Sequence, residues 1–324
     1  MKVIRDISKW DRKEAGCVLS IGNFDGVHVG HQLILEEAKK EASRRRKRLF
    51  VMTFEPHPVA VLFPEKNPGV LTPLEMKEYY LACCGIDVLI VLPSDRGLLE
   101  LCPEEFVEEF LVKGVLPAIV FEGEDFNFGR SRSGGLDIFR RLGNEKGFEV
   151  RIIDEKEIVL SGGESVRASS SLIRNLLDAG NVSEAAKVLG RPYRLIGHVV
   201  KGRGRGKELG FATANLEPVN QVIPAEGVYA GFVRFGESIE KLCGKSEAHF
   251  AAFSIGGGET FGVCSPQLIE AHLLEENVAD LIGNRITMGF RERLRGQQRF
   301  SSEAELIKQI QKDCARAEQI LKKL

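Results

Sequence analysis

Residues 18–31 constrain the fold more than any other segment of the chain. An apolar run at 18–21 reads as a short buried strand, and a turn rich in glycine follows it directly. A helix is expected to begin beside His28 and His31, which are three residues apart. The first turn of a helix presents unpaired backbone N–H groups and the positive end of the helix dipole. This segment therefore predicts a strand, a turn and a helix N-terminus suited to an anion such as a nucleotide phosphate.

The first half of the chain repeats this alternation of strand and helix. Apolar runs occur at 18–21, 49–54, 88–92, 118–121 and 149–153. Helical patterns lie between them, such as the apolar face of Ile34, Leu35, Ala38 and Ala42, and a helix start at Pro103. Such alternation predicts a Rossmann-like α/β fold, with a parallel sheet covered by helices on both faces. Ligands of these sheets bind beyond the carboxyl ends of the strands, where the turn after residue 21 lies.

The pattern changes near Leu189. Two short helices are expected at about 170–179 and 182–189, and strands at 195–200, 228–235, 250–255 and 268–274. These short runs with many glycines predict a small antiparallel β-barrel. A terminal helix is expected from 302 to 322, with Ser302 and Glu305 at capping-box spacing. Because 324 residues exceed one ordinary core, we expect two domains, 1–188 and 189–324.

Composition narrows the class of protein. A formal net charge of −1 and 43% hydrophobic residues are typical of a soluble globular protein and do not favour nucleic acid as a ligand. Seven cysteines, with no Cys-x-x-Cys pair, indicate free thiols in a reducing cytoplasm. The sequence has no signal core and no apolar run long enough for a membrane. The basic run 44–48 is expected to be a solvated helix end. A homo-oligomer is compatible with all of this.

The two histidines suggest a specific chemistry. Imidazole N–H groups could stabilise an α-phosphate while pyrophosphate leaves, and Gly30 would let the backbone approach the nucleotide closely. The alternative is that the histidines only cap a helix. Further along, residues 165–174 combine three serines at a helix start with Arg167 and Arg174, which could clamp a triphosphate. By itself that segment is equally compatible with a capped surface helix.

A second glycine-rich segment lies at 197–215 and carries four basic side chains. Its backbone N–H groups could bind phosphate, although RNA contact or a flexible hairpin would suit the same composition. Thr213 and Asn215 follow it with the spacing that places both on one side of a strand. Two neutral oxygen ligands would suit a Mg²⁺ ion that keeps several waters, and two hydrogen-bonding strand residues are the alternative.

The N-terminal motifs resemble those of bacterial FAD synthetases. The motifs are Gly22-Asn-Phe-Asp-Gly-Val-His-Val-Gly-His31, Thr53-Phe-Glu-Pro-His-Pro58, Gly123-Glu-Asp-Phe-Asn-Phe-Gly129 and Ser169-Ser-Ser-Leu-Ile-Arg174. The resemblance implies that His28 and His31 stabilise the transferring phosphate. It further implies nucleotide contacts from Gly22, Asn23, Phe24, Gly30, Arg167, Ser170, Ser171 and Arg174. It implies substrate contacts from His57, Asp125 and Asn127, although His57 would serve equally well as a rigid loop residue.

The C-terminal half is similar to riboflavin kinases. The similarity rests on the glycine-rich loop with Leu209-Gly-Phe-Ala-Thr-Ala-Asn215, on Pro224-Ala-Glu-Gly-Val-Tyr229, on Ile269-Glu-Ala-His272 and on Arg299-Phe-Ser-Ser-Glu-Ala-Glu-Leu306. It implies that Thr213 and Asn215 hold Mg²⁺ with ATP, that Gly202 and Lys207 contact the nucleotide, and that Glu270 activates the ribityl hydroxyl. A carboxylate can accept the proton of an alcohol during phosphoryl transfer.

The chain therefore resembles the prokaryotic bifunctional riboflavin kinase/FMN adenylyltransferase family over its whole length. We expect riboflavin, FMN, FAD and ATP as partners, with Mg²⁺ as the metal. An adenylyltransferase with a decayed kinase half, a His-x-Gly-His transferase with another acceptor, and a non-catalytic flavin- or RNA-binding regulator are the alternatives.

Three departures from the family pattern affect the expected sites. Ala212 stands where proline is usual, residues 254–262 lack an arginine and a proline, and Gly69-Val70 replaces Pro-Arg. The missing arginine is expected near the substrate phosphate. Losing one such contact costs about 1.5–3 kcal/mol where no neighbour replaces it.

Overall fold

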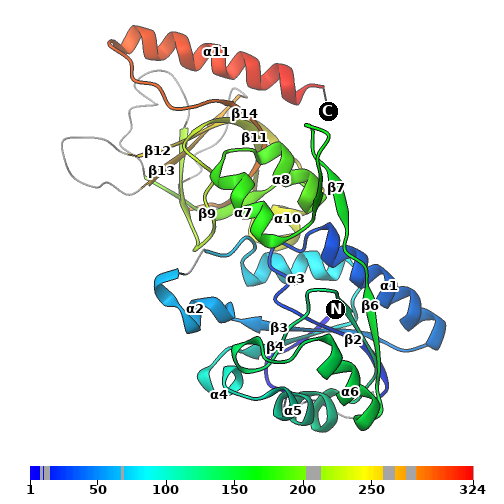
Figure 1. The fold of residues 1–324 in the computed structure, drawn as a ribbon. Coiled ribbons are helices and arrows are strands. Elements are labelled where there is room, and N and C mark those ends of the chain that lie inside the picture. Colours follow the sequence, from blue (N-terminus) through cyan, green and yellow to red (C-terminus); the bar gives the residue numbers. More distant parts are fainter. Residues whose placement is uncertain are drawn as a thin grey trace. The chain divides into compact units, whose positions relative to one another are not determined.

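The structure is a computed structural model that describes residues 1–7, 10, 15–66, 69–201, 213–257, 267–274 and 282–323. The chain divides into two compact units (Figure 1). The first, here called the sheet unit, comprises Met1–Ile158 with Ser165–Ala168. The second, the barrel unit, comprises Val159–Glu164 with Ser169–Leu324. Gly202, Lys207 and Ala212, together with residues 258–262 of the departing stretch, lie outside the described residues.

A parallel sheet of six strands forms the centre of the sheet unit, in the order β1-β4-β3-β2-β5-β6. The strands are β1 (Lys2–Ile4), β2 (Cys17–Ile21), β3 (Leu49–Glu55), β4 (Val88–Pro93), β5 (Pro117–Gly123) and β6 (Glu149–Ile153). Five of them confirm the predicted apolar runs, and β1 was not predicted. Every residue of β2 is buried, because a parallel sheet is covered on both faces.

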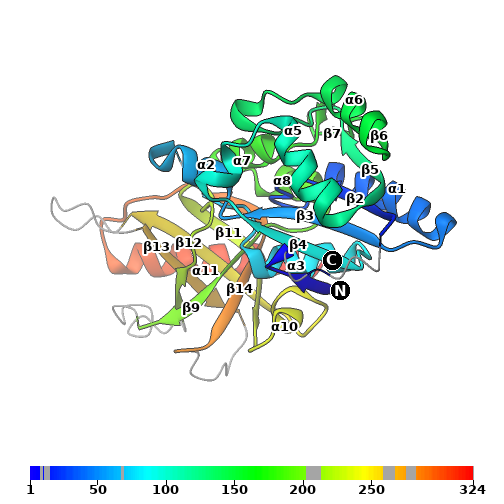
Figure 2. The ribbon, with the colours of Figure 1, turned by 90° about the horizontal axis from the view of Figure 1, so that it is seen from below.

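Helices cover the two faces of this sheet (Figure 2). The helices are α1 (Val29–Arg45), α3 (Leu74–Cys83), α5 (Pro103–Phe106), the π-helix η4 (Val107–Val115) and α6 (Leu136–Lys146). Leu19 and Met52 pack with Phe106, Leu111 and Phe139 from the last three helices in one core cluster. The alternate strand residues face the other side, where Figure 1 shows α1 and α3. The predicted α/β layering is confirmed.

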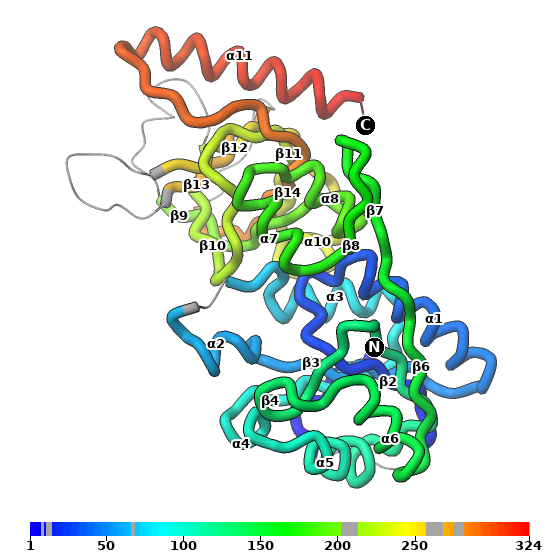
Figure 3. Tube along the Cα trace, in the orientation of Figure 1, coloured from blue at the N-terminus to red at the C-terminus, as the bar shows by residue number. Residues whose placement is uncertain are grey.

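Short elements complete the sheet unit, and β7 and β8 form a separate two-stranded ribbon (Figure 3). These elements are α2 (Pro58–Leu62), η3 (Pro64–Lys66), α4 (Arg96–Leu99), η5 (Arg130–Arg132), β7 (Glu157–Val159) and β8 (Ser165–Arg167). Several of them follow the carboxyl ends of strands, so they border the edge of the sheet at which ligands of such folds bind.

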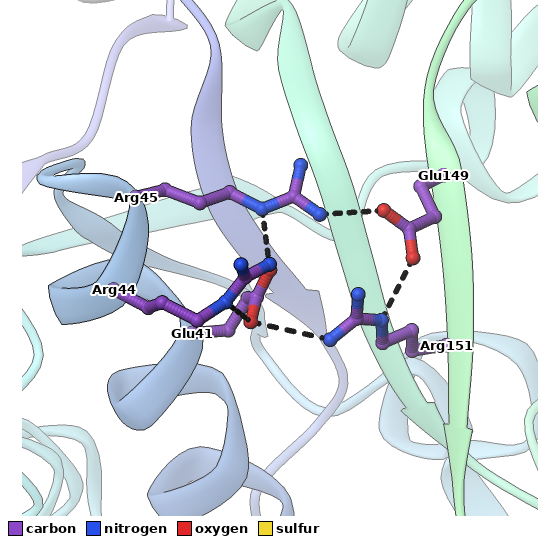
Figure 4. Close-up of polar contacts among 5 residues, drawn as sticks. All are labelled: Glu41, Arg44, Arg45, Glu149 and Arg151. Carbon is purple, nitrogen blue, oxygen red and sulfur yellow. Dashed lines mark hydrogen bonds and ion pairs between the residues drawn. The ribbon is translucent and has the colours of Figure 1, made fainter.

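The basic run at the end of α1 is more than a solvated helix end. Figure 4 shows Glu41, almost buried on α1, between Arg44, Arg45 and Arg151. Arg44 Nη2 lies 2.6 Å from Glu41 Oε1, and Arg151 Nη1 lies 3.3 Å from Glu41 Oε2. Glu149 of β6 also forms ion pairs with Arg45, at 2.6 Å, and with Arg151, at 2.7 Å. This charge network joins the helix to the edge strand of the sheet.

A closed antiparallel barrel forms the centre of the barrel unit, in the order β10-β13-β12-β11-β14-β9. Its strands are β9 (Arg194–Val200), β10 (Thr213–Pro218), β11 (Gly227–Phe235), β12 (His249–Gly257), β13 (Gln267–Leu273) and β14 (Arg285–Arg295). Tyr229, Phe253 and Phe290 are fully buried, and the ring of Phe290 makes edge-to-face contacts with the other two. The predicted small barrel is confirmed.

The terminal helix α11 (Glu303–Leu321) packs on the outside of the barrel. Ala317 and Leu321 contact a cluster that includes Ala230 and Ala252. Ser302 caps the helix as predicted, since its side chain accepts from the N–H of Glu305. The partners of the side chain of Glu305 are the N–H and hydroxyl of Ser301, so half of the capping box is formed with a neighbour.

Helices α7 (Ser170–Asp178), α8 (Val182–Leu189) and α10 (Ile239–Cys243) complete the barrel unit. The backbone N–H of Ala225 donates to Leu177 O at 2.9 Å, and the guanidinium of Arg293 donates to Ala179 O and Glu226 O. Helices α7 and α8 were predicted, and α10 was not. They belong to the barrel unit, and a domain boundary between residues 188 and 189 stays a prediction.

Two further predictions concern the described residues. Cys17, Cys83, Cys84, Cys102, Cys243 and Cys314 are all free thiols, as the absence of paired cysteine motifs indicated. Across the described parts of the chain, none of the helices has the length and apolar character needed to cross a membrane.

Candidate functional site

The loop between β2 and α1 positions the two histidines. His28 is the N-cap of α1, and its Nδ1 accepts from the N–H of His31 at 3.4 Å. The two imidazole rings stack with centroids 3.6 Å apart and an interplanar angle of 21°. The edge of Phe24 contacts His31, with ring centroids 5.1 Å apart. The structure thus brings both predicted histidines together at a helix N-terminus.

The structure explains the need for glycine at position 30 in a different way from the sequence prediction. A Cβ at this position would lie 3.1 Å from the imidazole of His28, which is tighter than ordinary van der Waals contact. The glycine therefore leaves space for the stacked ring of His28. Close approach of a nucleotide to this backbone stays a prediction.

The same loop is held in an unusual backbone conformation. Phe24, Val27 and Gly26 all have positive φ angles, of 47°, 40° and 85°. Two of these three are not glycine, and such residues cost about 1–3 kcal/mol each when they are held by the surrounding fold. Asp25 supplies the hold, because its buried carboxylate accepts from the N–H groups of Leu71 and Thr72 at 3.0–3.1 Å.

Asn23 lies at the end of β2, beside the neighbouring strand. Its backbone oxygen accepts from Thr53 Oγ1 at 3.2 Å, so the loop is tied to β3. Its side-chain Oδ1 is buried and has no hydrogen-bond partner in the described part of the chain. A buried unsatisfied oxygen is costly, and a ligand that donates a hydrogen bond would remove the cost. This is consistent with the predicted nucleotide contact.

Three further candidates meet beyond the end of β5. Arg167 Nη2 lies 2.8 Å from Asp125 Oδ2, and Arg167 also pairs with Glu155. Asn127 Nδ2 donates to the backbone oxygen of Asp125 at 2.7 Å. The guanidinium of Arg167 is therefore bound by carboxylates in this state, and a triphosphate would have to replace them or join them.

His57 caps a helix in the same unit. Its Nδ1 accepts from the N–H of Val59 at 3.2 Å, at the start of α2. This matches the reading of His57 as a fixed loop residue. A direct substrate contact stays a prediction.

A buried carboxyl group that was not predicted from the sequence lies beside the end of β2. Glu122 of β5 is 3% exposed, and its Oε1 accepts from the N–H of Ile21 at 2.7 Å. Burial raises the pKa of Glu122 well above its usual range, and nearby Asp125 raises it further. The only signal in the sequence is a glutamate that interrupts the apolar run of β5. Its position supports the last residue of β2.

In the barrel unit, one row of side chains crosses three neighbouring strands. Glu270 of β13 lies directly opposite Asn215 of β10 on one side and Ser254 of β12 on the other. Directly opposite residues share a face of the sheet. Ala252, two residues before Ser254, packs against α11, so this row lies on the outer face of the barrel.

This row contains residues that were predicted for the kinase site. Asn215 is 8% exposed, and its Oδ1 has no hydrogen-bond partner among the described residues. Thr213 lies two residues away on the same face, opposite His272. Burial raises the pKa of Glu270 above its ordinary value. An amide oxygen without a partner beside a carboxylate is suited to a cation with oxygen ligands.

The departure at 254–262 has a structural counterpart within its described part. Gln297 Nε2 donates to Ser254 Oγ at 3.1 Å and to Ile255 O at 2.8 Å. A Cβ at position 256 would come within 2.9 Å of that Nε2. Gly256 therefore accommodates Gln297, which holds the segment after β14 against β12.

The segment Ser169–Arg174 belongs to the barrel unit, whereas Arg167 belongs to the sheet unit. Ser169 caps α7 by accepting from the N–H of Leu172 at 3.1 Å. Ser171 is exposed, whereas Ser170 and Arg174 are half-buried. Their predicted contact with a triphosphate is not tested by these positions.

Comparison with known proteins decides the family. Residues 11–167 match the family model described as FAD synthetase, and residues 189–321 match the model described as riboflavin kinase. The chain is 37% identical over 314 residues to the bifunctional riboflavin kinase/FMN adenylyltransferase of Escherichia coli K12, covering 97% of this chain and 96% of the relative. The chain belongs to this bifunctional family.

Other relatives agree with this membership. The protein of the same description from Listeria monocytogenes is 33% identical over 299 residues, covering 91% of this chain and 90% of the relative. Among solved structures, a protein from Streptococcus pneumoniae named macrolide-efflux protein superposes with a TM-score of 0.82 at 27% identity, over 96% of each chain. Both halves match enzyme families, so neither a decayed kinase half nor a non-catalytic regulator gains support.

Proposed function

We propose that this chain phosphorylates riboflavin to FMN on the outer face of the barrel and adenylylates FMN to FAD at the end of the parallel sheet. ATP is the co-substrate of both reactions, as membership of a kinase and adenylyltransferase family requires. The observation that carries the proposal is that each half of the chain matches its own enzyme family while presenting a separate group of polar residues. We further propose that the protein acts in the cytoplasm.

In the kinase reaction, the 5′-hydroxyl oxygen of riboflavin forms a bond to the γ-phosphorus of ATP, and the bond from that phosphorus to the β-phosphate oxygen breaks. ADP leaves with the electron pair, and the hydroxyl proton passes to the carboxylate of Glu270. Burial raises the pKa of Glu270, which makes its ionised form a stronger base. The position of Glu270 beside Asn215 supports this role.

The residues present fit a magnesium ion in the barrel. Asn215 Oδ1 is buried without a partner in the described chain, and Thr213 adds a hydroxyl on the same face. Both are neutral oxygen donors, which suits an ion that retains waters and phosphate oxygens. When bound, Mg²⁺ would neutralise phosphate charge.

In the adenylyl-transfer reaction, a phosphate oxygen of FMN forms a bond to the α-phosphorus of ATP and pyrophosphate leaves. We assign to His28 and His31 the hydrogen bonds that stabilise the charge developing on the phosphate oxygens. Their position at the N-terminus of α1 adds the positive end of the helix dipole. Asn23 Oδ1 would accept a hydrogen bond from the nucleotide. Arg167, Ser170, Ser171 and Arg174 are proposed for the triphosphate.

The experiment separates the two activities within one chain. Purified protein is incubated with riboflavin, ATP and Mg²⁺, and the flavins are resolved by chromatography, with and without dithionite. Wild type should yield FMN and then FAD. Glu270→Gln should yield no FMN yet convert supplied FMN to FAD, whereas His28→Ala should stop at FMN. Loss of both activities in either folded variant would contradict the two-site assignment.

A further inference from the structure

A buried lysine lies beneath the loop that carries the histidines, and the reactions described so far do not use it. Lys77 of α3 is 4% exposed and shares its helix face with Met76, Tyr80 and Leu81, all of them buried. Lysine is rarely buried to this extent unless its ammonium is paired. The partners of its ammonium therefore indicate what Lys77 does.

One carboxylate forms an ion pair with the ammonium of Lys77, and a second acts on it electrostatically. Its Nζ lies 3.7 Å from Glu55 Oε2, at the carboxyl end of β3. Burial lowers the pKa of Lys77. The negative charges of Glu55 and Asp25 oppose this shift. The carboxylate of Asp25 in turn binds Leu71 and Thr72. One positive charge thus balances two negative charges, one from the last residue of β3 and one from the loop between β2 and α1.

Each of these two segments leads to a candidate site residue. Asp25 belongs to the strained turn that ends at His28, and Glu55 is two residues before His57. Asp25 and Glu55 thus lie near the carboxyl ends of two adjacent parallel strands, β2 and β3. The ammonium therefore acts on the two segments that border the expected ligand edge of the sheet.

We propose that Lys77 is a positioning residue for adenylyl transfer, which holds the His28 loop and the end of β3 in place and offsets their negative charge beside two anionic substrates. The inference rests on the proposed function of this edge. It also bears on the absence of an arginine at Val70, because Leu71, the next residue, is bound by the same carboxylate of Asp25 that Lys77 compensates.

The charge balance gives the expected direction of the effect. Without the ammonium, the negative charges of Asp25 and Glu55 are no longer balanced by Lys77 near the proposed site, so we expect weaker binding of the anionic substrates ATP and FMN. In Lys77→Met, we expect kcat/KM for FMN adenylylation to fall on the order of 10- to 100-fold, through higher KM values for ATP and FMN. Added salt should reduce this difference, since it screens the repulsion.

The design has controls within the same chain. Riboflavin phosphorylation by Lys77→Met should keep its kcat and KM, and Lys77→Arg should retain most of the adenylylation. Lys39→Met is the matched control, because it removes a 3.3 Å ion pair with Asp87 at the other end of the sheet. Asp25→Asn keeps an oxygen for Leu71 and Thr72 while removing a charge, and should restore activity to Lys77→Met.

Three results would overturn the proposal. The first is unchanged adenylylation kinetics in folded Lys77→Met at a temperature well below its melting point. The second is an equal loss in Lys39→Met. The third concerns a Lys77→Met protein that does not fold. In that case, failure of the added Asp25→Asn substitution to restore folding or activity would overturn the proposal. Absence of FMN adenylylation in the wild type would instead contradict the proposed function, so the two failures are distinguishable.

Discussion

Asn215 and Glu270 lie directly opposite each other on β10 and β13, with an amide oxygen that has no partner in the described chain beside a half-buried carboxylate. The buried amide oxygen of Asn215 has lost contact with water, and partial burial disfavours the charged form of Glu270, so neither group is in a favourable environment without a ligand. The pair therefore identifies the part of the barrel where a cation and a hydroxyl are expected to meet.

Replacement of Asn215 tests the cation half of this pair. Asn215→Ala should lower kcat/KM of riboflavin phosphorylation by at least about tenfold and raise the Mg²⁺ concentration needed for half-maximal rate. Titration of the kinase rate with Mg²⁺ measures both. FMN adenylylation should not change, and Asn215→Ala with normal Mg²⁺ dependence would exclude a metal role for this residue.

The acid side of the pH profile tests Glu270. Its pKa is raised by burial, and the base is the ionised form, so kinase activity should fall as pH decreases through a value above the ordinary pKa of a glutamate. The rate of FMN formation from pH 4.5 to 9 measures this. Glu270→Asp offers the comparison, because a shorter carboxylate in the same row should be slower and should show its own acid limb. An identical acid limb in both would assign the ionisation to another group.

The ion pair between Arg295 of β14 and Asp313 of α11 is expected to hold the terminal helix on the barrel. Arg295 Nη2 lies 2.7 Å from Asp313 Oδ2, and the two side chains are only 15% and 9% exposed. Removal of one partner leaves a buried charge, so Asp313→Asn should lower the free energy of unfolding of the barrel by about 3 kcal/mol. Denaturant unfolding monitored by helix signal measures this loss.

A surface pair on the same helix supplies the control for that experiment. Glu318 and Lys322 are 2.6 Å apart but largely exposed, and exposed pairs contribute about 0–1 kcal/mol. Glu318→Gln should therefore leave unfolding nearly unchanged. Equal effects of the two substitutions would mean that burial does not govern the strength of these ion pairs.

The charge network at the end of α1 predicts a dependence on salt and acid. Arg44 and Arg45 hold the pKa of Glu41 well below its usual range. A depressed carboxyl pKa contributes stability above the pKa of the unfolded chain and loses it as pH falls toward the folded value. Glu41→Gln should lower the melting temperature of the sheet unit at pH 7, with a smaller difference at high salt or at pH 3.

Glu37→Gln provides the comparison for this network. Glu37 contacts only Lys40, at 2.8 Å, among the described ion pairs, and both side chains are more exposed than Glu41. Its replacement should shift the melting temperature less than that of Glu41. A salt-independent effect of Glu41→Gln would point to packing in place of charge.

Local pattern was sufficient to predict a large part of this protein. The apolar runs of β2 to β6 and the capped start of α11 could be read from the sequence, because strand burial and helix capping depend on residues close together along the chain. His28 and His31 could be read for the same reason, since a spacing of three residues on a helix start determines that the rings meet.

Only the tertiary structure decided which distant residues share an environment. Lys77, Glu55 and Asp25 lie far apart in sequence, and nothing local distinguishes this lysine from the many exposed ones. Glu270 gained its place from strand register, which pairs it with Asn215 and Ser254 across the barrel. Burial and register arise from the closure of the whole fold, so the charge and hydrogen-bond partners of such groups follow from packing between segments that the sequence keeps apart.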